Sequence, residues 1–420
     1  MLDKREIREH PDAVKEAVRV KGIDLDVDEL LRLDQASRTL QHELDQAQAR
    51  RRSSSREFAR ADEARRAELR AEHEEHETQL KALREQLAET NEKLQGLLLL
   101  TPTIPWKSAP VGPDESANVT IKSVGTPPEF DFKPLDHVEL LETRGWADFT
   151  RARKVSGARA YALTSDMVLF ERAVHAYALD LLQAKDFTLV SVPSLVREEA
   201  LIGTGQFPAH REETYAIPAD DLYLAGTAEV ALVGFHSDEI LDHKHLPIRY
   251  AGISPCFRRE AGSAGRDVRG LLRVHQFEKV EQFVLCAADA AESDRWHAEL
   301  LGTAEQLLQG LELAYEVVEC STGDMGAGKY RMNDINTWMP SLGAYRETHS
   351  CSSLHDWQAR RANLRYRDAD GTVRFVYTLN NTAVATPRIL AALVENHQTS
   401  EAQVQVPAVL RPYLGGRELL

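Results

Sequence analysis

The 420-residue sequence lacks several features that would define its class at once. It has no run of about 18 apolar residues, so we expect no membrane-spanning helix. Its first residues, MLDKREIREH, are charged where a secretory signal needs an apolar core, and we expect a cytoplasmic protein. The four cysteines form no C-x-x-C pair, which predicts buried, reduced thiols rather than disulfides or a zinc finger.

Acidic residues outnumber basic ones, which gives a formal net charge of −15. This charge argues against non-specific binding of nucleic acid, although it does not exclude a local basic patch. The balance reverses in residues 50–70, where eight arginines stand against four acidic residues. This segment is therefore a candidate for contact with a phosphate backbone.

The first hundred residues contain a single aromatic residue, Phe58, and residues 23–95 contain neither Gly nor Pro. Mostly small or apolar residues recur at spacings of three and four in two stripes, over residues 30–58 and 69–97. A mean period of 3.5 residues is typical of a coiled coil. The two stripes face each other if the chain folds back near residue 63, which predicts an antiparallel hairpin with its turn at residues 60–64.

Each helix of this hairpin would extend about 50 Å, with the arginine-rich segment at the tip. Such an arm is too thin to enclose a ligand, but its tip can reach a distant phosphate backbone. A plain coiled coil used for dimerisation also fits the pattern, because charge runs on helices are usually solvated faces.

The composition changes after residue 100. Residues 101–135 are rich in proline and read as a junction. Beyond it, hydrophobic periodicity predicts a helix over 165–185 and strands at 187–195, 222–224, 274–285, 315–318, 362–367 and 373–378. Short turns between strands favour an antiparallel sheet, and the lack of a regular β-α-β-α order argues against a P-loop domain. We expect an α+β fold with domains at 1–105 and 106–420.

One glycine-rich string imitates a phosphate-binding loop. Residues 323–330, GDMGAGKY, nearly match the Walker A pattern, but Tyr330 stands where Ser or Thr should bind Mg²⁺. The residues that follow do not look like the helix that the motif requires. We interpret the string as a glycine-rich turn.

Residues 257–283, FRREAGSAGRDVRGLLRVHQFEKVEQF, carry the strongest chemical signal. The pattern predicts a strand, a polar loop containing Gly262, Gly265 and Gly270, and a returning strand beside Arg258 and Glu260. Because side chains alternate along a strand, one face is expected to hold Arg273, His275, Phe277, Lys279 and Glu281. Such a face suits a nucleotide beside an amine-bearing substrate, although a salt-bridged outer face of a sheet fits the same residues.

Longer strings resemble the bacterial seryl-tRNA synthetases, a family of class II aminoacyl-tRNA synthetases. Residues 257–283 are similar to the family's motif 2, LNNTAVATPRILAALVENHQ at 379–398 to motif 3, and the helix and strand that end at Pro193 to motif 1. GTAEVAL at 226–232 and RETHSCSSLHDWQARRANLRYR at 346–367 are similar to its serine and ATP segments. The basic-tipped hairpin resembles its tRNA-binding arm.

The resemblance implies an antiparallel-sheet class II catalytic domain with a coiled-coil arm, and it assigns roles to residues. Those implied to bind serine are Thr227, Ala228, Glu229, Arg258, Glu281 and Thr382. Those implied to bind ATP are Arg258, Arg259, Glu260, Val274, Phe277, Glu347, Thr348, His349, Ser350 and Arg388. Glu347 and Ser350 are the implied Mg²⁺ ligands, and the implied catalytic residues are Arg258, Arg388 and Glu347. The implied tRNA contacts are Arg51, Arg56 and Arg60.

The implied reaction has two steps. Serine and ATP give seryl-adenylate, and the seryl group then passes to the 3′ end of tRNA(Ser), with tRNA(Sec) as a second implied acceptor. The first step brings two anions together, so two arginines and a carboxylate-held Mg²⁺ suit it. In this reading Phe277 stacks on one face of adenine and Arg388 covers the other face of the same ring. The resemblance to motif 1 implies a homodimer.

Asn381 and the pair Thr348–His349 depart from the commoner family pattern, at positions that bear on the fine geometry for adenine and metal. Two rival functions also remain open at this point. One is a related ligase that loads an amino acid onto a carrier protein, although such an enzyme would not need the arm. The other is a non-catalytic relative that binds RNA, although loss of Arg258 or Arg388 would be expected there.

Overall fold

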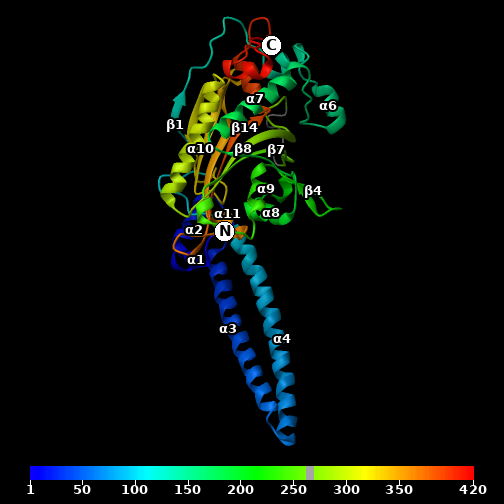
Figure 1. Ribbon diagram of the computed structural model, residues 1–420, viewed down its shortest axis with the longest axis vertical. Helices are drawn as coiled ribbons and strands as arrows, with labels where there is room; N and C mark the ends of the chain where they lie inside the picture. The colour runs from blue at the N-terminus through cyan, green and yellow to red at the C-terminus, as the bar shows by residue number, and fades with distance from the viewer. Residues whose placement is uncertain (262–268) are drawn as a thin grey trace. The chain divides into compact units, whose positions relative to one another are not determined.

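The structure is a computed structural model that describes residues 1–261 and 269–420. Gly262 and Gly265 of the predicted motif 2 loop lie outside the described residues. The described chain divides into two compact units, Met1–Pro102 and Thr103–Leu420 (Figure 1). No described helix combines the length and apolarity needed to cross a bilayer.

The N-terminal unit is the predicted antiparallel hairpin, formed by α3 (Val27–Phe58) and α4 (Glu63–Leu100). Its turn at residues 59–62 comes slightly earlier than predicted, because Asp62 caps α4 by accepting a hydrogen bond from the Arg65 N–H. The two stripes meet along the arm in a cluster of Leu40, Leu44, Ala47, Leu80, Leu83 and Leu87. Two short helices, α1 (Lys4–Glu9) and α2 (Pro11–Val20), pack on the open end of the hairpin.

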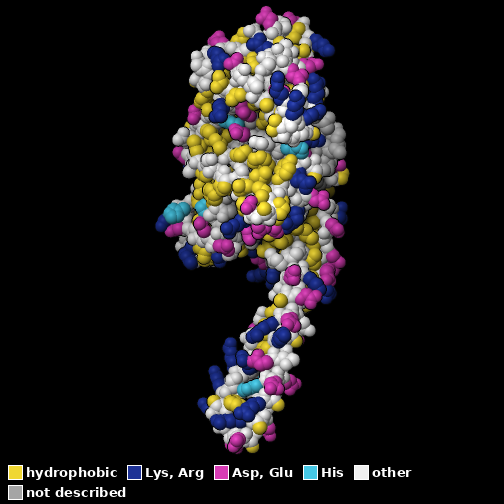
Figure 2. All heavy atoms as spheres, turned by 90° about the vertical axis from the view of Figure 1, so that its right-hand side faces the viewer, with side chains coloured by type: hydrophobic (Ala, Val, Ile, Leu, Met, Phe, Trp, Pro, Cys, Tyr) yellow, Lys and Arg dark blue, Asp and Glu magenta, His cyan; other side chains and the backbone are white. Residues whose placement is uncertain are grey.

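The tip of the hairpin is basic but partly neutralised. Arg51 pairs with Glu77, and Arg65 pairs with three glutamates of the arm. Arg56 and Arg60 are exposed and form no ion pair with any described residue. Figure 2 shows Lys and Arg side chains gathered at this end of the arm, with carboxylates among them.

The C-terminal unit is built on an eight-stranded sheet whose strand order is β1-β9-β10-β11-β14-β8-β7-β2. The pairs are antiparallel except for the edge pair β2–β7, which is parallel. The strands in that order are β1 (Val119–Val124), β9 (Tyr315–Glu319), β10 (Arg331–Met339), β11 (Ala344–His355), β14 (Tyr377–Thr386), β8 (Gln276–Cys286), β7 (Ile248–Phe257) and β2 (Thr188–Ser191).

Helices cover the two faces of this sheet unequally. The main hydrophobic cluster joins one face to α7 (Asp166–Ala184), α10 (Ala290–Gly310) and α12 (Arg388–Asn396). A smaller cluster joins part of the other face to α9 (Ala228–Phe235) and α11 (Trp357–Arg361). Figure 1 shows α10 and α9 on opposite sides of the strands. The face that α9 covers only in part therefore has room for a ligand.

Shorter elements complete the unit. The helices are α5 (His137–Thr143), α6 (Phe149–Ser156) and α8 (Glu198–Thr204). One three-stranded sheet contains β13 (Val373–Phe375), β12 (Arg365–Arg367) and β6 (Ile240–Asp242). Another contains β3 (Leu195–Val196), β5 (Leu222–Leu224) and β4 (Tyr215–Ile217).

Several sequence predictions are confirmed and three strand ranges are wrong in part. The range 187–195 splits between β2 and the start of β3, because residues 192–194 around Pro193 lie in no strand. The helix predicted at 165–185 is α7, and the strand predicted at 274–285 is β8. The range 362–367 fails at its start because α11 ends there and Asn363 adopts a left-handed conformation, with φ 52°. The range 373–378 splits between β13 and the start of β14. The strand predicted before Arg258 is β7, which is ten residues long.

Two further sequence predictions for this unit are confirmed. All four cysteines are free and buried. The glycine-rich string at 323–330 forms turns and leads into strand β10 instead of a helix, so it lacks the framework of a P-loop.

Candidate active site

The described parts of the motif 2 segment, residues 257–261 and 269–283, contribute side chains to the open face of the sheet. Arg258 directly follows β7, and its N–H donates to the His275 carbonyl oxygen at 2.9 Å across the β7–β8 pair. Phe277, Lys279 and Glu281 alternate along β8 and share one face, as predicted. Arg273 and His275 precede β8 and are not part of this alternation.

A cavity opens on this face of the sheet. Its walls come from the motif 2 segment, β8, β11, β14 and the start of α12. The lining residues are Arg258, Glu260, Leu271, Leu272, Arg273, Val274, Phe277, Lys279, Glu347, Thr348, Thr382, Ala385, Thr386, Pro387 and Arg388. The structure thus brings eight of the predicted site residues to one cavity, from segments far apart in the sequence.

The two key arginines are held differently. The guanidinium carbon of Arg258 lies 5.1 Å from the ring centroid of Phe277, the ring that was predicted to stack on adenine. Arg388 donates from Nε to the Leu272 carbonyl oxygen at 3.0 Å and from Nη1 to the Glu347 carbonyl oxygen at 2.9 Å. Its Nη1 also lies 3.4 Å from the Glu347 carboxylate. Arg388 is therefore fixed by motif 2 and β11 before any ligand arrives.

A second pocket shares Arg258 with this cavity and is also lined by Thr227. The Thr227 hydroxyl donates to Glu281 Oε2, which also accepts the Glu229 N–H at 3.1 Å. Lys279 Nζ lies 2.9 Å from Glu281 Oε1 and 2.8 Å from Thr227 Oγ1. Lys279 was placed on this face by the alternation but was missing from the predicted site residues.

Glu229 is half-buried beside Glu281. Its Oε1 accepts hydrogen bonds from Gln358 Nε2 at 2.6 Å and from Asn380 Nδ2 at 2.7 Å. Burial, followed by the nearby Glu281 carboxylate, raises the pKa of Glu229 to about 7. Gln358 and Asn380 were also absent from the predicted set, because a lone amide in a strand or helix gives no pattern in a sequence.

A β-bulge explains how Glu347 and Ser350 reach the same side of β11. Glu347 pairs with Asn336 and Ser350 with Asp334, and the register shifts between these pairs. Asn336 and Asp334 share a face of β10, so their partners on β11 do too. Without the extra residue, an odd spacing would direct Glu347 and Ser350 to opposite faces.

The oxygen atoms at this bulge fit a hard divalent cation. Ser350 Oγ and Asp334 Oδ1 are buried and have no hydrogen-bond partner of normal geometry among the described residues. Burial, with Glu347 nearby, raises the pKa of Asp334 to about 7. Carboxylate and hydroxyl oxygens are the ligands that Mg²⁺ prefers, so the residues present fit the predicted ion.

Seven of the fifteen residues predicted for serine, ATP or Mg²⁺ do not line the cavity, and three of these have side chains engaged elsewhere. His349 lies on the opposite face of β11, where its Nε2 meets the Ala383 carbonyl oxygen at 3.0 Å and burial lowers its pKa to about 4. The Arg259 guanidinium donates instead to the Glu212 carbonyl oxygen at 3.0 Å. Ala228 packs in the hydrophobic cluster beneath α9.

Comparison with known proteins identifies the family. Residues 1–105 match the seryl-tRNA synthetase N-terminal domain, and residues 214–397 match the tRNA synthetase class II core domain (G, H, P, S and T). A serine–tRNA ligase from Deinococcus radiodurans is 52% identical over 420 residues, covering 100% of this chain and 99% of the relative. The chain belongs to the seryl-tRNA synthetase family.

Solved members of the seryl-tRNA synthetase family share the fold of this chain. The crystal structure of seryl-tRNA synthetase from Pyrococcus horikoshii complexed with ATP is 40% identical, with a TM-score of 0.91, and covers 100% of this chain and 99% of that one. A cytoplasmic serine–tRNA ligase from Naegleria fowleri in complex with AMP is 31% identical, with a TM-score of 0.88, and covers 100% of this chain and 98% of that one. The predicted fold class, with its antiparallel-rich sheet and helical arm, is confirmed, and membership makes this chain a class II aminoacyl-tRNA ligase.

The raised pKa of Glu229 predicts a pH-dependent penalty on stability. The ionised form is disfavoured in the folded protein, so stability falls as the pH rises from the ordinary carboxyl range through about 7. Glu229→Gln keeps an oxygen acceptor for Gln358 and Asn380 but cannot ionise. The melting temperature of the variant minus that of the parent should increase by a few degrees from about pH 4.5 to about pH 8.5.

Thermal melts of the ligand-free protein across this pH range measure the difference. Glu401→Gln, at an exposed position, is the control and should leave the pH dependence unchanged. A difference in melting temperature between Glu229→Gln and the parent that stays constant with pH would contradict the burial of an ionising carboxyl group.

Proposed function

We propose that this chain activates L-serine with ATP to seryl-adenylate and then transfers the seryl group to the 3′ end of tRNA(Ser), and also of tRNA(Sec). A cytoplasmic location is part of the proposal. The observation that carries it is the meeting of Arg258, Phe277, Glu347 and Arg388 around one cavity. Beside it lies a pocket lined by Thr227, whose hydroxyl contacts Glu281. The ATP and AMP complexes of the two solved relatives support a nucleotide in this cavity.

In the first step, the serine carboxylate oxygen bonds to the α-phosphorus of ATP and the bond to the β-phosphate breaks, which releases pyrophosphate. Arg258 and Arg388 would neutralise the two anions and align them, so no strong base is needed. Glu347 and Ser350 would hold Mg²⁺, which supplies positive charge at the phosphates when bound. In the second step, the 3′-hydroxyl of the tRNA attacks the seryl carbonyl, loses its proton and displaces AMP.

The Thr227–Glu281 pocket supports selection of serine. Glu281 would accept the substrate ammonium, and Thr382, which pairs with Glu281 in the β8–β14 ladder, offers a hydroxyl beside it. A site built to bond a substrate hydroxyl rejects analogues that lack one, because its own buried polar groups are then left unpaired. Lys279 already compensates Glu281 in the free protein, so the carboxylate does not stay uncompensated before serine binds.

Serine-dependent exchange of pyrophosphate into ATP, followed by charging of tRNA(Ser) and tRNA(Sec), tests the proposal. Arg388→Ala should lower the exchange rate by about 10²–10³-fold, because a fixed cation at the developing charge is lost. Arg367→Ala, an exposed arginine of β12, is the matched control and should retain the parent rate.

The outcomes separate the rival functions. Exchange without charging of any tRNA would favour a ligase for a carrier protein. No exchange by a well-folded parent protein would favour a non-catalytic RNA-binding relative. The match of residues 1–105 to a seryl-tRNA synthetase domain already weighs against the carrier ligase.

The tip of the arm is proposed to bind tRNA. Replacing Arg51, Arg56 and Arg60 with Ala should weaken charging and leave pyrophosphate exchange nearly intact, since the chemistry of activation lies in the other unit. The effect on charging should shrink at high salt. The matched control replaces Arg32, Lys81 and Lys93, three cations of the arm outside the tip that pair with neighbouring glutamates. Equal loss of charging in both triple variants would sink the assignment to the tip.

A homodimer through motif 1 is also proposed. Strand β2 is an edge of the large sheet, and Leu189 on β2 and Leu169 on α7 are 41% and 47% exposed in the single chain. Sedimentation should give twice the chain mass, and Leu169→Glu with Leu189→Glu should give monomers. Leu195→Glu, at a position 50% exposed outside motif 1, should remain dimeric. A monomeric parent at working concentration would exclude this interface.

A further inference from the structure

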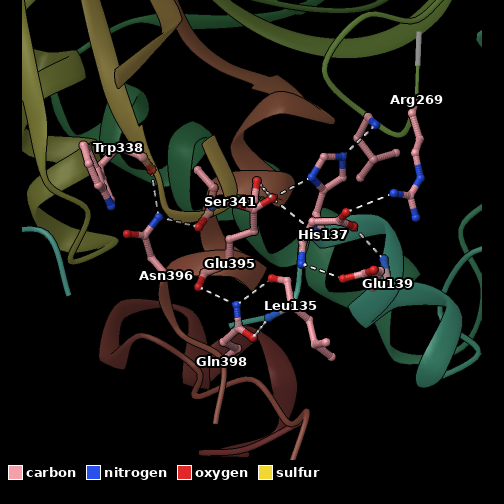
Figure 3. Close-up of polar contacts among 12 residues, drawn as sticks. Leu135, His137, Glu139, Arg269, Trp338, Ser341, Glu395, Asn396 and Gln398 are labelled. Atoms are coloured by element: carbon pink, nitrogen blue, oxygen red, sulfur yellow. Dashed lines mark hydrogen bonds and ion pairs between the residues drawn. The ribbon is translucent and has the colours of Figure 1, made fainter. Parts of the chain in front are cut away.

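A buried polar network outside the cavity joins three segments that lead into the site (Figure 3). His137, at the start of α5, points its ring between Glu395 of α12 and the end of the motif 2 segment. Its Nδ1 lies 2.7 Å from Glu395 Oε1, and its Nε2 lies 3.1 Å from the Leu271 nitrogen. Glu395 also accepts hydrogen bonds from the Ser341 N–H and hydroxyl, each at 2.9 Å, in the turn before β11.

The hydrogen bonds define the protonation of His137. A backbone N–H can only donate, so Nε2 accepts from Leu271 and carries no proton. The ring proton therefore sits on Nδ1 and is donated to Glu395. Burial alone would raise the pKa of Glu395, but hydrogen bonds from His137 and Ser341 overcome this and hold it below its usual value. The acceptor is thus a carboxylate, and the hydrogen bond from Nδ1 is charge-assisted.

The network also reaches Arg388, an arginine of the proposed active site. His137 holds Leu271, and the next residue, Leu272, accepts the hydrogen bond from Arg388 Nε at 3.0 Å. Arg388 opens α12 and Glu395 is its next-to-last residue. The two ends of this helix are therefore linked to the same stretch of motif 2, directly through Arg388 and indirectly from Glu395 through His137. A second link, between Arg269 and Asp136 at 3.1 Å, is more exposed and so contributes less.

Close packing supports a specific fit of motif 2 against this imidazole. Gly270 has a φ of 79°, and a Cβ atom built there would lie 2.2 Å from His137 Nε2. The backbone therefore approaches the ring more closely than a residue with a side chain would permit.

We propose that His137 is a positioning residue, which holds the Leu271–Leu272 segment in the place where its carbonyl orients Arg388 for the triphosphate. The inference rests on the proposed function, and it adds a residue of α5 that does not line the cavity. Loss of the Nε2 acceptor should release this segment and lower the affinity for ATP without removing any group that touches a substrate.

Two substitutions test separately the two hydrogen bonds of the His137 ring, to Glu395 and to Leu271. His137→Asn retains a donor near the position of Nδ1 for Glu395 but cannot reach Leu271. His137→Gln can offer an acceptor near the position of Nε2 but loses the donor to Glu395. In pyrophosphate exchange, the Asn variant should raise the KM for ATP by about tenfold and leave the KM for serine little changed. The Gln variant should stay nearer the parent.

The matched control is His297→Asn. His297 is also buried, at 1% exposed, but its Nε2 bonds to Asn333 Oδ1 on the helix-covered face of the sheet. This variant should lower the melting temperature while leaving the KM for ATP unchanged. If His137→Asn fails to fold, Gly270→Ala, whose Cβ would press on His137 Nε2 and displace the Leu271–Leu272 segment, should give the same selective rise in KM for ATP.

The outcomes are decisive. Absence of serine-dependent exchange in the parent protein overturns the proposed function, and the positioning role with it. Exchange in the parent with a normal KM for ATP in His137→Asn overturns the positioning role alone. Equal rises in the two KM values, or equal effects of Asn and Gln, would also overturn it, since they indicate a general loss of packing.

Discussion

The antiparallel pairing of β8 with β7 and with β14 is the constraint on which the proposed site depends. It sets Phe277, Lys279 and Glu281 on one face, brings Arg258 beside them from β7, and aligns Thr382 with Glu281 from β14. A slip of one residue in either pair would turn these side chains toward the helix-covered core. Val280, which lies between them, and Val284 pack under the helices and make such a slip costly.

Charge inside this unit is arranged before any ligand binds. Lys279 and Glu281 are buried together and share Thr227, so neither charge stays uncompensated when the pocket is empty. Arg388 is held by two backbone carbonyls rather than by a flexible surface partner. A cavity with fixed donors pays little reorganisation energy when a polyanion enters, which is the property that a phosphoryl-transfer site needs. The network around His137 extends this rigidity to the segment that carries one of these carbonyls.

Periodicity in the sequence predicted the features that depend on local pattern. Leucine spacing predicted the hairpin, and two-residue alternation predicted the shared face of Phe277, Lys279 and Glu281. The bulge of β11 could not be predicted in this way, because alternation alone separates Glu347 from Ser350 and gives no reason to turn His349 away. The link from His137 to Glu395 was equally invisible, since a lone histidine and a lone glutamate far apart in a sequence carry no pattern. Family resemblance supplied Glu347 and Ser350, and the structure supplies the physical reason that both reach one side.

The central claim is that one face of the sheet holds an amino acid beside a triphosphate. A crystal structure of the chain with serine and a non-hydrolysable ATP analogue tests it most directly. The account predicts the triphosphate between Arg258 and Arg388, the adenine against Phe277, and the serine ammonium at Glu281. A nucleotide bound elsewhere, such as at the glycine-rich turn of residues 323–330, with this cavity left empty, would contradict it.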